Sequence, residues 1–168
     1  MRPAKGDYGE YYQGYIDLVE GDDILKILLE NNQYAQDILN SFPQSKGNHR
    51  YAEGKWTVKE VVGHMMDVDR IFCYRALAIA RGEKKPLPGF DQDQYVLNGK
   101  FNNRPLYELT YEYRLVREAT ISLFNSFDHS VLHNRGNASG NDVTVLALMF
   151  MAAGHEKHHL NILNERYI

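Results

Sequence analysis

GHEKHHLNIL, residues 154–163, contains two histidines four residues apart, His155 and His159. Residues at that spacing lie on one side of an α-helix. The same side repeats in steps of three and four at Val145, Leu148, Ala152 and Ile162. The two imidazoles therefore occupy positions where a bundle helix normally places Leu or Ile, and we expect both to face a core.

An inward-facing histidine pair has two explanations. A single buried imidazole is most often a core residue that hydrogen-bonds to a carbonyl or a carboxylate. Burying His155 and His159 together leaves four ring nitrogens without water, and a shared metal ion satisfies them with fewer partners. The pair therefore indicates a metal site, provided that the chain supplies a third ligand.

The third ligand is expected upstream. Residues 155–159 also match H-E-x-x-H, the zinc-peptidase helix motif in which the glutamate, here Glu156, is the general base. Such enzymes need a further ligand, commonly downstream, and the only acidic side chain after His159 is Glu165, which helical geometry turns away from the pair. The helix angle also points Glu156 away from His155, so the peptidase is a minor alternative. The best upstream candidate is His64.

His64 lies in KWTVKEVVGHMMDVDRIF, residues 55–72, on a second amphipathic helix. Steps of three and four connect it to Val61, Val68, Ile71 and Arg75. This spacing predicts that His64 faces inward on an apolar stripe. Arg75, at the end of that stripe, either reaches solvent or an ion-pair partner, or grips an anionic group of a substrate.

Three further side chains near the expected site have less direct roles. Asp67, one turn from His64, either orients a ligand histidine from behind or is a solvated residue of the helix face. His158 lies off the inward face and is expected to be a supporting or surface group rather than a ligand. Cys73 is about 180° around the helix from His64, which favours a small buried hydrophobe over a nucleophile.

Composition favours one domain of ordinary globular type. The chain has 168 residues, 43% of them hydrophobic, and 19 basic against 22 acidic residues, for a net charge of −3. This balance gives no electrostatic footprint for nucleic acid. The single cysteine excludes an internal disulfide. Residues 1–12 lack the apolar core of a signal peptide, and the apolar run at 143–154 is too short to cross a bilayer, so we expect a soluble, cytoplasmic protein.

The periodicity predicts an all-α, four-helix bundle in a single domain, residues 1–168, preceded by a Tyr- and Gly-rich arm at 1–21. No strand is expected. The predicted helices run from Asp22 or Asp23 to Ser41, from the capping box Thr57-x-x-Glu60 to Gly82, from Pro105 to Phe127, and from Asp142 or Thr144 through the histidine pair.

The predicted connections after the second and third helices are long. Residues 83–104 exceed what neighbouring antiparallel helices need, so this segment either crosses the bundle or walls a pocket. Residues 128–142 form a second polar loop, which holds His129 and His133 outside any helical register. On the third helix the inward positions are predicted at Leu106, Leu109, Tyr113, Val116, Thr120, Leu123 and Phe127.

Two segments together resemble the DinB/YfiT-like superfamily of bundle metalloproteins. They are residues 51–96, with W-[ST]-x-x-E-x-x-x-H at Trp56, Thr57, Glu60 and His64, and residues 155–163, with H-x-x-x-H. The resemblance extends across nearly the whole chain. It implies one divalent ion, zinc or nickel, bound by three histidines that match His64, His155 and His159, and it implies a homodimer.

The resemblance leaves two classes of function open. One is a metal-dependent enzyme that activates a low-molecular-weight thiol or a water for attack on a small-molecule substrate, as a thiol S-transferase or a hydrolase. The other is a non-catalytic metal-binding protein, associated with stress or DNA damage, whose ion is structural. An open coordination position beside a pocket would favour the enzyme, and a fourth protein ligand would favour the structural role.

Overall fold

Four long helices form the body of the computed structural model, which describes residues 1–167. They are α2 (Ile24–Ser41), α3 (Val58–Ala80), α5 (Leu106–Asn125) and α6 (Val145–Arg166). α3 packs against both α5 and α6, and α2 packs against the same two helices. The all-α four-helix bundle expected from the sequence is therefore confirmed, with α2 and α3 at opposite corners.

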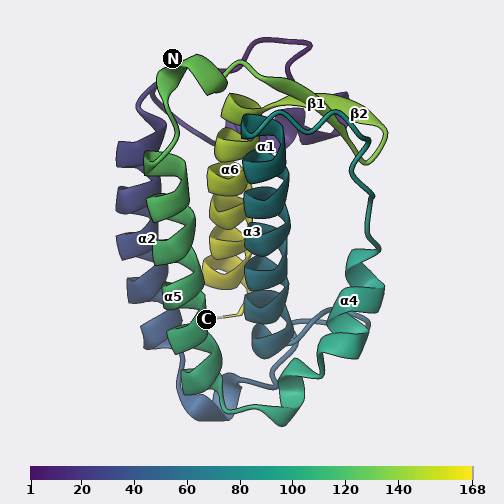
Figure 1. Ribbon diagram of the computed structural model, residues 1–168. Helices are drawn as coiled ribbons and strands as arrows, with labels where there is room; N and C mark the ends of the chain where they lie inside the picture. The colour runs from purple at the N-terminus through teal and green to yellow at the C-terminus, as the bar shows by residue number, and fades with distance from the viewer. Residues whose placement is uncertain (168) are drawn as a thin grey trace.

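The order of the helices explains one long connection. Figure 1 shows α3 and α5 running in the same direction, with α2 and α6 running in the opposite one. α3 has 23 residues, which at 1.5 Å per residue makes it about 35 Å long. The chain must travel back along that length before the parallel neighbour α5 can begin. Residues 81–105 do so on one side of the bundle, and they include the short helix α4 (Gln92–Gly99).

Side-chain caps fix where three of the four long helices begin. Thr57 and Glu60 form the predicted capping box at the start of α3. Of the two residues considered for α2, Asp23 accepts a hydrogen bond from the Lys26 amide. For α6 the cap is Thr144, whose hydroxyl accepts from the Ala147 amide. Gly82, with a φ of +91°, follows the end of α3 as expected.

The expectation that no strand would form is wrong. β1 (Arg135–Ala138) and β2 (Asn141–Thr144) pair antiparallel, with Ala138 opposite Asn141. Ser139 and Gly140 both have positive φ values, 54° and 78°, as a two-residue turn of this kind requires. Each strand has only four residues and little alternation of apolar and polar side chains, which is why the pattern did not show it.

Short helical segments complete the fold. The N-terminal arm contains a 3-10 turn, η1 (Glu10–Tyr12), and α1 (Gln13–Asp17), which packs against α6. Further 3-10 turns are η2 (Gln44–Lys46), η3 (Phe101–Asn103) and η4 (His129–Val131). Across residues 1–167 we find no helix with the length and apolar character needed to span a membrane.

Candidate metal centre

Three histidines from two helices meet inside the bundle. His64 comes from α3, and His155 and His159 come from successive turns of α6. The Nε2 atom of His155 lies 3.0 Å from Nε2 of His64 and 3.1 Å from Nε2 of His159. All three side chains are buried, with exposures of 3%, 4% and 8% in chain order. The structure thus brings together the three predicted ligands.

The spacing of these nitrogens suits a single ion. Two nitrogens bound to zinc at its usual bond length lie about 3.3 Å apart in a tetrahedron and about 3 Å apart at the right angle of an octahedron. The three candidate ligand atoms lie within 4.8 Å of one another. Within residues 1–167 no carbonyl or carboxylate accepts a hydrogen bond from any of these rings. The simpler explanation, in which each histidine is a separately satisfied core residue, therefore does not fit.

Burial also keeps the three rings neutral, which metal binding requires. Removal from water lowers the pKa of His64 to about 4, with a smaller contribution from His158. Desolvation likewise lowers the pKa values of His155 and His159 well below the usual range, and the neighbouring histidines add to the effect. At neutral pH the site is therefore a set of uncharged nitrogen lone pairs aimed at one point.

Aromatic rings surround the histidines. The ring of Trp56 lies 4.7 Å from that of His64, between centroids, and Tyr15 lies 5.5 Å from His155. Tyr15 comes from α1, and it reaches this position because Gly154 lets the backbone of α1 lie directly against α6. Burial raises the pKa of Tyr15 to about 12, so its hydroxyl stays protonated.

Cavities open on two sides of the histidine cluster. One, of about 330 Å³, is lined by His155 together with residues from the arm, α3, the connection after α3 and the hairpin turn: Tyr11, Tyr12, Tyr15, Val68, Phe72, Gly89, Phe90, Gln92, Ser139 and Asn141. We call it the His155 cavity. A second, of about 260 Å³, is lined by His159 with Trp56, Lys55 and Asp93 among others. The long connection after α3 therefore both crosses the bundle and walls a pocket.

Glu156 is held away from the histidines in a buried ionic network. Its carboxylate accepts hydrogen bonds from Tyr113 and, at 2.5 Å, from Arg117. Arg117 also donates two hydrogen bonds to Asp69, at 2.7 and 2.8 Å. Burial acts to lower the pKa of Arg117, but the two carboxylates outweigh it and raise the pKa. With both oxygens of Glu156 engaged, this residue does not offer a base to the histidine site.

The network changes the predicted inward face of α5. Arg117 and Phe124 are buried there, and the expected Val116 and Leu123 are only partly buried. Sequence reasoning assigns a charged residue to the surface by default, although Arg117 is four residues from Tyr113 and three from Thr120. Asp69 and Glu156, buried on α3 and α6, were the available signal, since a pair of inward carboxylates requires a cation between them.

The less direct candidates lie outside the cluster. Asp67 is half-buried, and its nearest charged partner is Arg70, at 3.7 Å. It is therefore a solvated residue of the helix face and does not orient a ligand histidine. His158 packs edge-on against the rings of Tyr15 and His159, as a supporting group would. Cys73 donates to the Thr120 hydroxyl, and burial raises the pKa of its thiol to about 11, as expected of a residue that is not a nucleophile.

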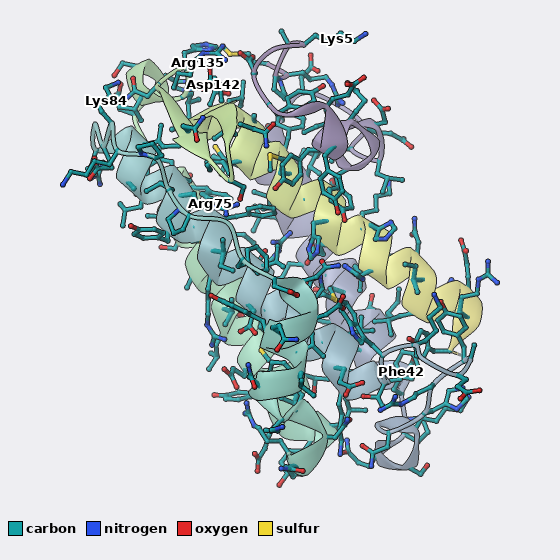
Figure 2. The ribbon with its side chains drawn as sticks, turned by 90° about the vertical axis from the view of Figure 1, so that its right-hand side faces the viewer. Lys5, Phe42, Arg75, Lys84, Arg135 and Asp142 are labelled. Atoms are coloured by element: carbon teal, nitrogen blue, oxygen red, sulfur yellow. The ribbon has the colours of Figure 1, made fainter. Side chains whose placement is uncertain are left out.

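Arg75 is buried behind two residues that line the His155 cavity, Phe90 and Ser139. Figure 2 labels it on α3, where the connection toward α4 passes close to the helix. Its Nη2 atom donates to the Pro88 carbonyl at 2.8 Å and to the Ser139 hydroxyl at 2.7 Å. Of the alternatives considered for Arg75, a solvent-reaching end of the stripe does not fit, because the side chain is 2% exposed.

Sequence reasoning missed two parts of the site. Tyr15 belongs to an arm without periodicity, so nothing in its spacing linked it to His155. Ser139 and Asn141 belong to the hairpin that was not expected. The one available signal was the Ser139-Gly140 pair, which favours a tight turn, but not the place where that turn packs.

Comparison with known proteins gives the same fold. A protein of Oceanobacillus iheyensis named "Putative metal-dependent hydrolase" is 25% identical over 130 residues, which cover 74% of this chain and 72% of that one. YfiT from Bacillus subtilis, described as "a probable metal-dependent hydrolase with an unusual four-helix bundle topology", superimposes with a TM-score of 0.76 at 15% identity, over 86% of this chain and 83% of that one.

A second solved structure is more distant in sequence. A mycothiol-dependent maleylpyruvate isomerase superimposes with a TM-score of 0.72 at 11% identity, and the match covers 87% of this chain and 61% of the isomerase. At these identities the two solved structures establish the fold alone. The sequence itself matches the family described as the DinB superfamily over residues 27–163. This chain is a member of the DinB superfamily.

Proposed function

We propose that this protein is a metal-dependent enzyme that activates a low-molecular-weight thiol at its three-histidine site for attack on a small electrophile. His64, His155 and His159 would hold the ion, zinc or nickel. A divalent ion in such a site lowers the pKa of a thiol or a water that binds beside it. The observation that carries the proposal is that His155, a buried ligand, also lines a cavity large enough for a small molecule.

Two features favour an enzyme over a structural ion. Among residues 1–167, no fourth His, Cys, Asp or Glu joins the three histidines, so the protein leaves a coordination position free. Structural zinc sites are normally closed by four protein ligands. Tyr15, Phe72 and Trp56 pack beside the imidazoles and restrict the approach of bulk water.

We choose a thiol over a water as the nucleophile because no carboxylate is available near the histidines to act as a general base. Hydrolysis by the peptidase mechanism needs a carboxylate near the ion, and Glu156 is bound to Arg117 and Tyr113 instead. A thiol needs less assistance, because it is more acidic than water and its anion is the better nucleophile for carbon. Hydrolysis remains the second candidate, since two of the similar proteins are described as hydrolases.

Metal analysis followed by thiol-consumption assays tests the proposal. Protein purified without an affinity tag should contain about one divalent ion per chain. Supplied with glutathione, bacillithiol or mycothiol and a panel of alkyl and aryl halides, it should consume thiol faster than the uncatalysed reaction. The His64→Ala variant should lose both properties, and His133→Ala, an exposed histidine of the polar loop, should lose neither.

The outcomes separate the alternatives. Full metal content in His64→Ala would refute the three-ligand assignment. Metal content of about one per chain without thiol consumption for any pair would refute the transferase. Ester or amide hydrolysis by the metal-loaded protein would then favour the hydrolase.

A further inference from the structure

We propose that the His155 cavity binds a small molecule through a carboxylate group, at the end formed by Ser139 and Asn141 and backed by Arg75. The opposite end of the molecule would lie at the three histidines. This inference rests on the proposed function, because it names the class of molecule that the metal centre acts on.

The first observation is that Arg75 is a buried cation without a carboxylate. It is 2% exposed, and within residues 1–167 it forms no salt bridge. Its Nη2 atom uses its hydrogens on two neutral oxygens, and no partner in that range accepts from Nη1 or Nε, which keep slight contact with solvent. Arg117, which is fully buried, is neutralised by Asp69 and Glu156. Because a guanidinium stays ionised, Arg75 is a site of uncompensated positive charge.

The second observation is that the contacts of Arg75 form the wall of the cavity. Ser139 accepts its hydrogen bond, and the Phe90 ring lies 5.9 Å from its guanidinium carbon. Both residues line the His155 cavity. Since the Ser139 oxygen accepts from Arg75, its hydroxyl hydrogen remains to be donated elsewhere. The positive charge therefore polarises a donor that belongs to the cavity surface.

The third observation concerns the other groups at that end. Gln92, Ser139 and Asn141 supply amide and hydroxyl groups, and none of the residues that line the cavity is Asp or Glu. An anion placed here meets hydrogen-bond donors and one guanidinium, with no carboxylate on the lining to repel it. One arginine neutralises a single negative charge, which favours a carboxylate over a doubly charged phosphate.

The position of the charge along α3 gives the length of the ligand. His64 and Arg75 are eleven positions apart on α3, or about 16 Å along the axis. The side chains of both residues lean toward the N-terminal end of α3, so this lean leaves the separation nearly unchanged. The metal–sulfur bond at one end and the hydrogen bond of the carboxylate at the other take up about 5 Å of it, which leaves roughly 11 Å for the ligand. Val68 and Phe72, on the same helix, line the cavity between the two ends. The middle of the ligand should therefore be apolar.

The inference is tested by measuring how tightly cobalt-loaded protein binds a series of mercapto acids of increasing chain length. The probes are 3-mercaptopropionate, 6-mercaptohexanoate and 8-mercaptooctanoate, each paired with its neutral amide, and binding is followed by the sulfur-to-cobalt absorption band. We expect the acid to bind roughly 10- to 100-fold more tightly than the amide at the length that spans the cavity. In Arg75→Met the acid and the amide should bind about equally tightly, and in Ser139→Ala the ratio of the two affinities should decrease.

Two variants keep the test independent of folding defects. Arg75→Lys retains the charge and should retain part of the preference. Arg70→Met removes an exposed arginine of the same helix, paired with Glu112, and should leave the preference unchanged. Equal affinity for acid and amide at every length, or a preference that survives in Arg75→Met, would overturn the inference while the cobalt band showed the metal centre to be intact.

Failure of the proposed function gives a different result. If no thiol produced a cobalt band, the anion site would be measured directly in chelator-treated protein, by calorimetric titration with octanoate and with octanamide. Tighter binding of octanoate that is lost in Arg75→Met would support the carboxylate site without the thiol chemistry. Equal binding of the two compounds would overturn it.

Discussion

Gly154 of α6 lies against the backbone of Tyr15, and a Cβ atom at position 154 would stand 2.0 Å from the Tyr15 carbonyl oxygen. This contact sets how closely α1 packs on α6 and hence where the Tyr15 ring lies over His155. Gly154→Ala should force the two backbones apart and destabilise the fold by about 1–3 kcal/mol.

Gly14, one residue before Tyr15, is the matched control. A Cβ atom at position 14 would meet no neighbouring atom within 4 Å, so Gly14→Ala should be neutral or slightly stabilising. The measurement is urea unfolding followed by circular dichroism. Equal stability of the two variants would show that the arm is not held by this contact.

Glu156→Gln separates the metal centre proposed here from a peptidase site. The amide keeps much of the shape of the carboxylate but removes its charge beside Arg117, so the variant should be less stable than the wild type. Metal content and thiol consumption per folded molecule should stay within about threefold of the wild-type values. A general base would contribute 10²–10⁴-fold. A loss of that size would restore the H-E-x-x-H interpretation.

Arg117→Met should be strongly destabilising, by about 3–5 kcal/mol, because it leaves Asp69 and Glu156 buried without a counter-charge. Arg114→Met, on the exposed side of the same helix, removes a surface pair with Glu118 at 3.5 Å and an exposed contact with the Tyr111 ring at 5.4 Å. Its cost should be about 1 kcal/mol. Denaturant unfolding of both variants measures the difference, and similar values would mean that the buried network contributes little.

The three histidines of the site could be predicted from the sequence, but most of the residues around them could not. His64, His155 and His159 could be identified because each interrupts an apolar stripe with helical spacing, and the capping box placed the start of α3. The same reasoning failed for Arg117, because a charge is assigned to the outside of a helix unless its partners on other helices are known. It also failed for Ser139 and Tyr15, whose positions depend on packing between distant segments rather than on any repeat.

Cys73 should react slowly with alkylating agents in the native protein. Burial raises the pKa of its thiol from 9.0 to about 11. Since the thiolate is the reactive form, the fraction available at pH 8 falls by about 100-fold relative to an unshifted thiol, and alkylation by iodoacetamide should slow at least as much. The rate should rise with pH up to about 11, and urea should abolish the protection. Rapid alkylation of the native protein at pH 8 would make Cys73 a candidate nucleophile after all.

Trp56 should report metal binding directly. It is the single tryptophan of the chain, and its ring lies 4.7 Å from His64 and 6.5 Å from His159, between centroids. Nickel or cobalt bound by these histidines should quench its fluorescence, because an ion with a partly filled d shell deactivates a nearby excited indole. The quenching should saturate at about one ion per chain and disappear in His64→Ala. Trp56→Phe should remove the signal and keep the metal, as measured by elemental analysis. Saturable quenching that persists in His64→Ala would place the ion elsewhere on the protein.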